Sequence, residues 1–88
     1  MKYVINGTWG GYSVPDEVRA VLGCNRYDEN VRTNSTFVNW VLAHFDTTNL
    51  KVVEIPKEAT DWELEEYDGL ESIIAVINGK IVHLSPIE

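Results

Sequence analysis

The 88-residue chain is poor in cysteine, in basic residues and in long apolar runs, and each shortage excludes a class of protein. Its one cysteine, Cys24, has no partner for a disulfide within the chain, which is typical of a reducing compartment. No apolar run approaches the roughly 18–20 residues of a membrane-spanning helix, and the N-terminus lacks the apolar region and cleavage site of a signal peptide. We therefore expect a cytoplasmic protein, folded as a single domain over residues 1–88.

Basic residues are outnumbered, because 7 Lys and Arg stand against 14 Asp and Glu and give a net charge of −7. Residues 54–71 contain eight acids and one base, so this segment carries the whole net charge and the rest of the chain sums to zero. A protein that binds duplex nucleic acid normally presents a basic stripe. We therefore expect no direct binding of DNA or RNA.

A strand and a short helix are predicted at the start of the chain. Residues 2–6 are rich in β-formers and alternate, which indicates a strand. Ser13 and Asp16 have the spacing of a helix N-terminus, with Val14 as an alternative cap because it precedes a proline. Gly23 suits the end of this helix.

The second predicted helix covers residues 35–45, with Thr33 or Asn34 as its cap. Its apolar residues recur at helical spacing and predict one buried stripe. That stripe consists of Phe37, Val38, Val41, Leu42 and Phe45.

The second half of the chain reads as strands. Residues 50–56 and 62–67 each predict one, and residues 72–84 predict a β-hairpin that turns at Asn78-Gly79, a pair suited to a type I′ turn. The expected order is β-α-α-β-β-β-β. It predicts an α+β fold in which two helices pack on one face of a mainly antiparallel sheet of about four to five strands.

Five segments carry a family resemblance: "YVIN", "GGYSVPDE", "RTNSTFV", "LKVVEIP" and "DWELEEYDGLESI". In this pattern the chain resembles a family of small uncharacterised proteins from phages and prophages of bacteria. The resemblance implies a bacterial host cell as the source and implies no known activity. Many members end in a basic tail rich in His and Arg, whereas this chain continues as "IIAVINGKIVHLSPIE". Any function of that tail is therefore not carried over.

A glycine-rich loop between the first strand and the first helix is a candidate ligand site. It contains Gly7, Trp9, Gly10, Gly11 and Tyr12. Its spacing matches neither phosphate-binding glycine motif, and no lysine follows. We favour a structural connection, in which the glycines permit positive φ or close approach of the chain. A small-ligand or peptide groove is the alternative.

The acidic segment is a second candidate. On a strand, Asp61, Glu63 and Glu65 point to one face while Trp62 and Leu64 point to the other. The carboxylates either form a solvated face or bind a basic protein partner; calcium is disfavoured because the EF-hand order is absent. The predicted acidic face comprises Asp61, Glu63, Glu65, Glu66, Asp68 and Glu71.

Catalysis is not expected, because Cys24, His44 and His83 match no nucleophile signature. No metal or cofactor is expected either. Among the three tryptophans, Trp40 lies at the border of the apolar stripe. We predict that it is the most exposed of the three, either as a contact residue or as a border residue that covers the edge of the core.

The sequence thus favours a non-enzymatic protein-interaction module that uses the acidic face. Its partner would be a protein of the host or the phage, for example a basic nucleic-acid-binding protein. The alternatives are a small-ligand or peptide binder that uses residues 7–12 and a homodimeric structural protein.

Overall fold

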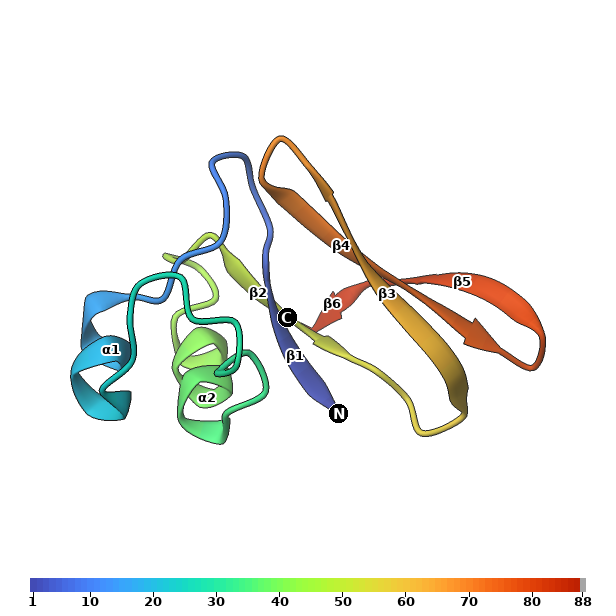
Figure 1. Cartoon of the computed structure of the whole chain (residues 1–88), viewed down its shortest axis with the longest axis horizontal. Coiled ribbons are helices and arrows are strands. Elements are labelled where there is room, and N and C mark those ends of the chain that lie inside the picture. Colours follow the sequence, from blue (N-terminus) through green and yellow to red (C-terminus); the bar gives the residue numbers. More distant parts are fainter. Residues whose placement is uncertain (88) are drawn as a thin grey trace.

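The computed structural model describes residues 1–87 and arranges them in three layers (Figure 1). In chain order the elements are β1 (Lys2–Asn6), α1 (Asp16–Leu22), α2 (Ser35–Ala43), β2 (Leu50–Glu54), β3 (Ala59–Tyr67), β4 (Leu70–Ile77), β5 (Lys80–Leu84) and β6 (Pro86–Ile87). The helices form one outer layer, a sheet of order β1-β2-β6 lies in the middle, and a sheet of order β3-β4-β5 forms the other outer layer. All the strand pairings are antiparallel.

The middle sheet is buried on both faces. Val52 of β2 packs with Val4 toward the helices, while the next residue, Val53, packs with Ile5 toward the outer sheet. The α+β class is confirmed, but the prediction of one sheet of four to five strands is wrong. β2 has two consecutive buried valines, so it lacks the apolar–polar alternation of a strand with one exposed face. β6 pairs with β2 directly after the hairpin and so belongs to the middle sheet rather than to the sheet of the hairpin.

The first helix begins after Pro15, and no side chain caps it. The expectation that Ser13 or Val14 caps this helix is therefore wrong. Gly23 ends the helix with a left-handed φ of 66°, as predicted. Because α1 has only seven residues, packing of Val18 against the core holds it rather than its own propensity.

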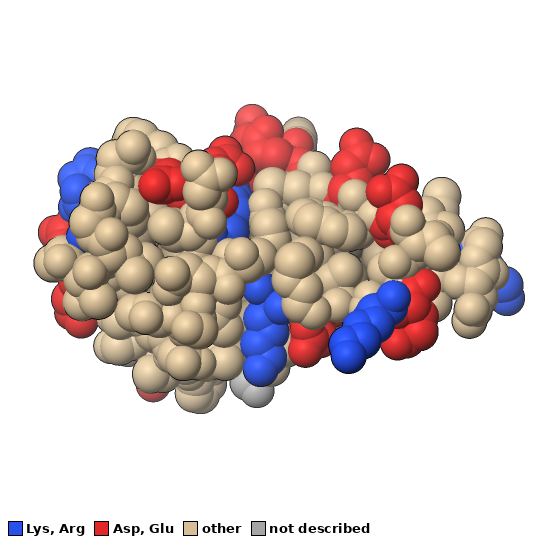
Figure 2. All heavy atoms as spheres, turned by 60° about the horizontal axis from the view of Figure 1, so that its bottom comes forward, with Lys and Arg blue, Asp and Glu red and all other residues tan. Residues whose placement is uncertain are grey.

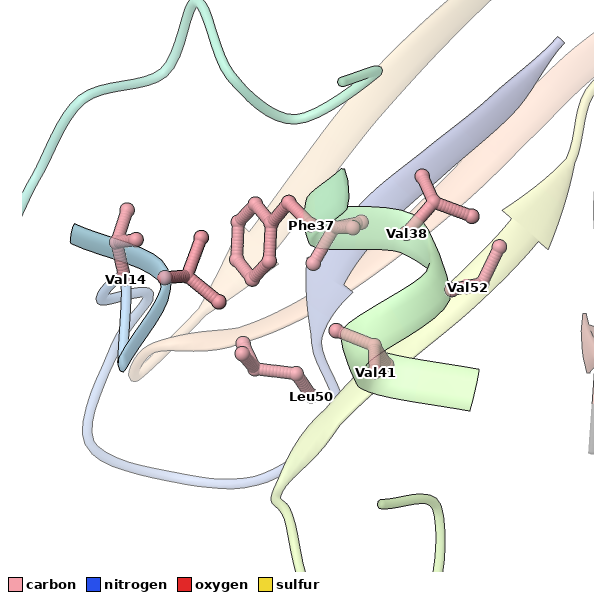
Figure 3. Close-up of a cluster of buried hydrophobic side chains, with 8 residues drawn as sticks. Val14, Phe37, Val38, Val41, Leu50 and Val52 are labelled. Atoms are coloured by element: carbon pink, nitrogen blue, oxygen red, sulfur yellow. The ribbon is translucent and has the colours of Figure 1, made fainter. Parts of the chain in front are cut away.

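The second helix contributes Phe37, Val38 and Val41 to the core between the helices and the middle sheet. Asn34 caps it by accepting a hydrogen bond from the Thr36 N–H at 2.9 Å. Figure 3 shows Phe37 and Val41 gathered with side chains from the rest of this core. The helix ends at Ala43, two residues earlier than predicted, so Phe45 lies outside the stripe and is exposed.

A second core fills the space between the two sheets. Trp62 and Leu64 point inward from β3, as the alternation predicted, and pack against Ile5 and Ile73. The Trp62 ring also meets the Tyr3 ring edge-on, with their centroids 5.0 Å apart. The outer sheet is therefore held to the middle sheet by one of its two faces.

Tight turns close both hairpins of the outer sheet. The β4–β5 turn has positive φ at Asn78 (52°) and Gly79 (76°), which confirms the predicted hairpin. The β3–β4 turn has the same character, with φ of 50° at Asp68 and 88° at Gly69.

A buried ion pair joins the loop before α2 to the outer sheet. Arg32 is 1% exposed, and its Nη1 and Nη2 donate to the two carboxylate oxygens of Glu71 on β4, each at 2.8 Å. Its Nε lies 3.3 Å from the Glu29 carboxylate. The guanidinium also lies over the ring of Tyr12, 3.7 Å from its centroid, and 5.4 Å from that of Tyr3.

The same pair closes the free edge of β1. The Val4 N–H donates to the Arg32 carbonyl, and the Val4 carbonyl accepts from Arg32 Nη1, both at 2.9 Å. The Asn6 N–H donates to Glu71 Oε1 at 2.7 Å. Burial by itself lowers the pKa of Arg32, but its hydrogen bonds to Glu71 and the Glu71 charge raise that pKa above its ordinary value. Arg32 and Glu71 therefore supply hydrogen-bond partners that a neighbouring strand would otherwise provide to the edge of β1.

Glu71→Gln is expected to lower the free energy of unfolding by about 3 kcal/mol or more, because it leaves the buried Arg32 charge without its ionic partner. The control is Asp16→Asn, which removes the exposed partner of Arg19 on α1. It should cost less than about 1 kcal/mol. Urea denaturation at neutral pH measures both, and equal losses would contradict the assigned role of the buried pair.

Tyr12→Phe is expected to change the alkaline limb of the stability profile. Burial raises the pKa of Tyr12 well above its ordinary 10.0 and outweighs the lowering by Arg32. The folded protein therefore holds the phenol proton more tightly, and this contribution to stability is lost as pH rises above that ordinary value. The variant lacks the Tyr12–Asp28 hydrogen bond, so its free energy of unfolding at neutral pH should be about 1 kcal/mol lower. Its stability should also decline less steeply as the pH becomes alkaline.

The control for this measurement is Tyr27→Phe, at a tyrosine that is 67% exposed. Denaturant titrations at intervals from neutral to strongly alkaline pH compare the two variants with the native chain. If the alkaline decline of Tyr12→Phe matches that of Tyr27→Phe, the buried phenol is not its source.

Candidate functional site

The outer face of the β3-β4-β5 sheet is the candidate site. We define it as the side chains that point away from the middle sheet. Strand alternation and the pairing register assign Asp61, Glu63, Glu65 and Tyr67 of β3, Leu70, Ser72, Ile74 and Val76 of β4, and Ile81 and His83 of β5 to this outer face. No helix or strand within residues 1–87 covers it.

Asp61, Glu63 and Glu65 form an acidic row along this face, and all three are exposed. Alternate residues of a strand lie about 6.6–6.8 Å apart. In the described part of the chain, none of the three carboxylates lies within 4.0 Å of a basic nitrogen. Figure 2 shows acidic side chains gathered on the half of the molecule that the outer sheet forms. The row is therefore free to meet an external cation.

An apolar strip lies beside the acidic row. Val76 pairs with Asp61, Ile74 pairs with Glu63, and Ile81 continues the strip on β5 with 71% of its surface exposed. A shallow hollow of about 130 Å³ lies among these five residues, with Trp62 and Ala75 completing its lining. The outer face therefore places three apolar side chains directly beside the acidic row.

Three of the predicted acidic residues do not belong to this face. Glu66 points to the other side of β3, and its Oε1 accepts the Gly69 N–H at 2.7 Å, so it caps the turn. Asp68 lies in the turn itself. Placing Glu71 on the acidic surface is wrong because it is only 8% exposed and pairs with Arg32. Nothing in the spacing of the acids marks a partner 39 residues away.

The β3–β4 turn packs against the glycine loop. A Cβ added at Gly69 would lie 2.2 Å from the Gly11 backbone nitrogen and 2.8 Å from that of Gly10. Asn6 Nδ2 donates to the carbonyls of Gly69 and Thr8, both at 2.6 Å. The glycines thus allow two backbones to touch, which is the structural role that the sequence favoured.

A polar hollow of about 270 Å³ lies on the other side of this loop. Its lining residues include Thr8, Ser13, Thr48, Asn49 and Trp9, and none of its lining residues is charged. Of the predicted loop residues, Gly7 and Tyr12 do not line it: a Gly7 Cβ would meet Lys51, and Tyr12 packs on the core.

The prediction that Trp40 is the most exposed tryptophan is wrong, and Trp40 instead packs at the edge of the helix-side core, which was the alternative. Trp40 is partly buried, stacks on His44 with ring centroids 4.1 Å apart, and donates to Glu17 at 3.1 Å. Trp9 is the most exposed of the three at 61% and meets Tyr67 edge-on. Tyr67 was not predicted as a residue of this face, although it follows Glu65 by two residues and so points to the same side as the acidic row.

The three residues considered for catalysis lie in different parts of the fold. Cys24 packs against the helix-side core, His44 stacks on Trp40 after α2, and His83 lies on β5. Over residues 1–87, no three or more His, Cys, Asp or Glu side chains are grouped so that they could hold a metal ion. None of the helices in this range is both long and apolar enough to cross a membrane.

Comparisons of the chain with protein-family models, with curated proteins and with solved structures found no match. The phage or prophage family thus stays a prediction from the sequence segments. A function for this chain therefore has to be inferred from its own geometry.

Gly69→Ala and Gly79→Ala together test whether the β3–β4 turn packs against the glycine loop. Both glycines have positive φ, so each alanine should cost about 1–2 kcal/mol of stability. At Gly79 a Cβ meets nothing within 4 Å, whereas at Gly69 it meets backbone. Gly69→Ala should therefore cost about 1–3 kcal/mol more, by overpacking. Similar denaturation midpoints for the two variants would show that the turn does not rest on the loop.

Proposed function

We propose that the chain is a non-enzymatic protein-interaction module that binds a basic segment of another protein through the outer face. The observation that carries this proposal is the acidic row of Asp61, Glu63 and Glu65 beside the apolar strip of Ile74, Val76 and Ile81. A partner with Lys or Arg next to apolar side chains would complement both features.

Electrostatics supports this reading of the row. Like charges at alternate positions on one strand face repel one another, and no basic residue of the described chain pairs with them. A basic partner would relieve that repulsion and would gain in association rate from the surrounding negative charge. The apolar strip would then supply the contact area that charge alone does not.

The partner belongs to the same proposal. The resemblance to phage and prophage proteins is our basis for proposing a protein of the bacterial host or of the phage. A basic nucleic-acid-binding protein fits best, since its phosphate-binding surface already carries the required charge. The module itself would make no contact with nucleic acid.

The test compares Glu63→Lys/Glu65→Lys with a matched control, Asp46→Lys/Glu58→Lys, which makes the same change in charge at exposed positions in turns. Each folded protein is used to capture partners from a bacterial lysate at low salt, and mass spectrometry identifies them. We expect the native chain and the control to capture the same basic protein, and the row variant to lose it. Rising salt should release it. Equal capture by the row variant would overturn the proposal.

A second candidate function is favoured by the polar hollow beside the glycine loop. Hydroxyl and amide groups around an exposed tryptophan suit a small uncharged polar ligand. A ligand of this kind should raise the thermal midpoint of the native chain, and Asn49→Ala should abolish that rise. A screen of neutral polar compounds without any shift would argue against this function.

A further inference from the structure

An exposed aromatic pair ends the acidic row. Tyr67 is the last residue of β3 and is 65% exposed, and the Trp9 ring lies against it with centroids 5.9 Å apart and planes inclined at 70°. The two rings therefore make an open corner on the surface. The nearest residue on the same strand face is Glu65, one step back along the row.

The backbone holds this corner in place. Trp9 directly precedes Gly10, whose N–H donates to the Asp68 carbonyl at 3.4 Å. The contact of Gly69 with the glycine loop and its hydrogen bond from Asn6 fix the turn that follows Tyr67. The backbone that carries both rings is therefore held in place, which reduces the ordering that a ligand would have to impose.

The chain already binds a guanidinium with this combination of groups. In the interior, the Arg32 guanidinium lies 3.7 Å from the Tyr12 centroid and 5.4 Å from the Tyr3 centroid, and the Glu71 carboxylate binds it at 2.8 Å. At the surface, Trp9 and Tyr67 supply two rings in contact, and Glu65 is the preceding residue of β3 on the same face as Tyr67. A cation is attracted to the face of an aromatic ring, most strongly to that of tryptophan.

We propose that the Trp9–Tyr67 corner is a subsite for a cationic side chain of the partner, arginine or lysine. The inference rests on the proposed function and deepens it, because it names what the partner presents at the end of the row. An extended segment with basic residues at alternate positions would match the spacing of β3, about 6.6–6.8 Å. Its basic groups would meet Asp61, Glu63 and Glu65 in turn and then the aromatic corner.

The test titrates the full chain with a seven-residue peptide of alternating arginine and serine. Heteronuclear NMR follows the Trp9 indole N–H and the backbone amides of Glu63 and Glu65. We expect all three signals to shift together and the binding to weaken with salt. Trp9→Leu and Tyr67→Leu should each weaken binding by about 2- to 5-fold. Tyr67→Phe, which keeps the ring, should bind like the native chain.

Tyr27→Leu is the matched control, because Tyr27 is as exposed as Tyr67 and lies in the loop between the helices. It should leave the affinity unchanged, and unchanged signal dispersion verifies that each variant is folded. If the peptide shifts the Glu63 and Glu65 amides but Trp9→Leu and Tyr67→Leu bind it normally, the subsite is overturned and the proposed function survives. If the peptide shifts none of the signals, both fail.

Discussion

The buried pair of Arg32 and Glu71 is the contact on which the rest of the structure depends. It joins the loop before α2 to β4, and it satisfies the edge of β1 at Val4 and Asn6. Paired charges in a protein interior add little net stability but are costly to separate. The planar guanidinium of Arg32 donates two parallel hydrogen bonds to the Glu71 carboxylate, and this geometry fixes the position of β4 relative to the middle sheet.

That position determines what the outer sheet presents. Trp62 and Leu64 on its inner face pack against the middle sheet, and the β3–β4 turn packs against the glycine loop. The outer face then carries the acidic row, the apolar strip and the aromatic corner on one continuous surface. For the proposed interaction, strands whose other face is packed offer a more rigid surface than loops would, which reduces the ordering cost of binding.

Much of the fold could be predicted from the sequence, because its signals are local. Alternation in β3, the Asn78-Gly79 turn and the left-handed end at Gly23 each depend on neighbouring residues. The split into two sheets could not be predicted, since the apolar run of β2 is equally suited to one covered face or two. Glu71 was misplaced for a similar reason, because its burial depends on Arg32, a partner distant in sequence. Trp40 is partly buried because it packs against the helix-side core.

The most direct test of the central claim is hydrogen exchange at the Asn6 backbone amide, whose acceptor is Glu71 Oε1. If the ion pair closes the edge of β1, this amide should exchange only through global unfolding, as slowly as the slowest amides of the core. Glu71→Gln should then accelerate its exchange more than its overall loss of stability explains. Exchange of Asn6 in the native chain as fast as that of the exposed Asn78 amide would contradict the account.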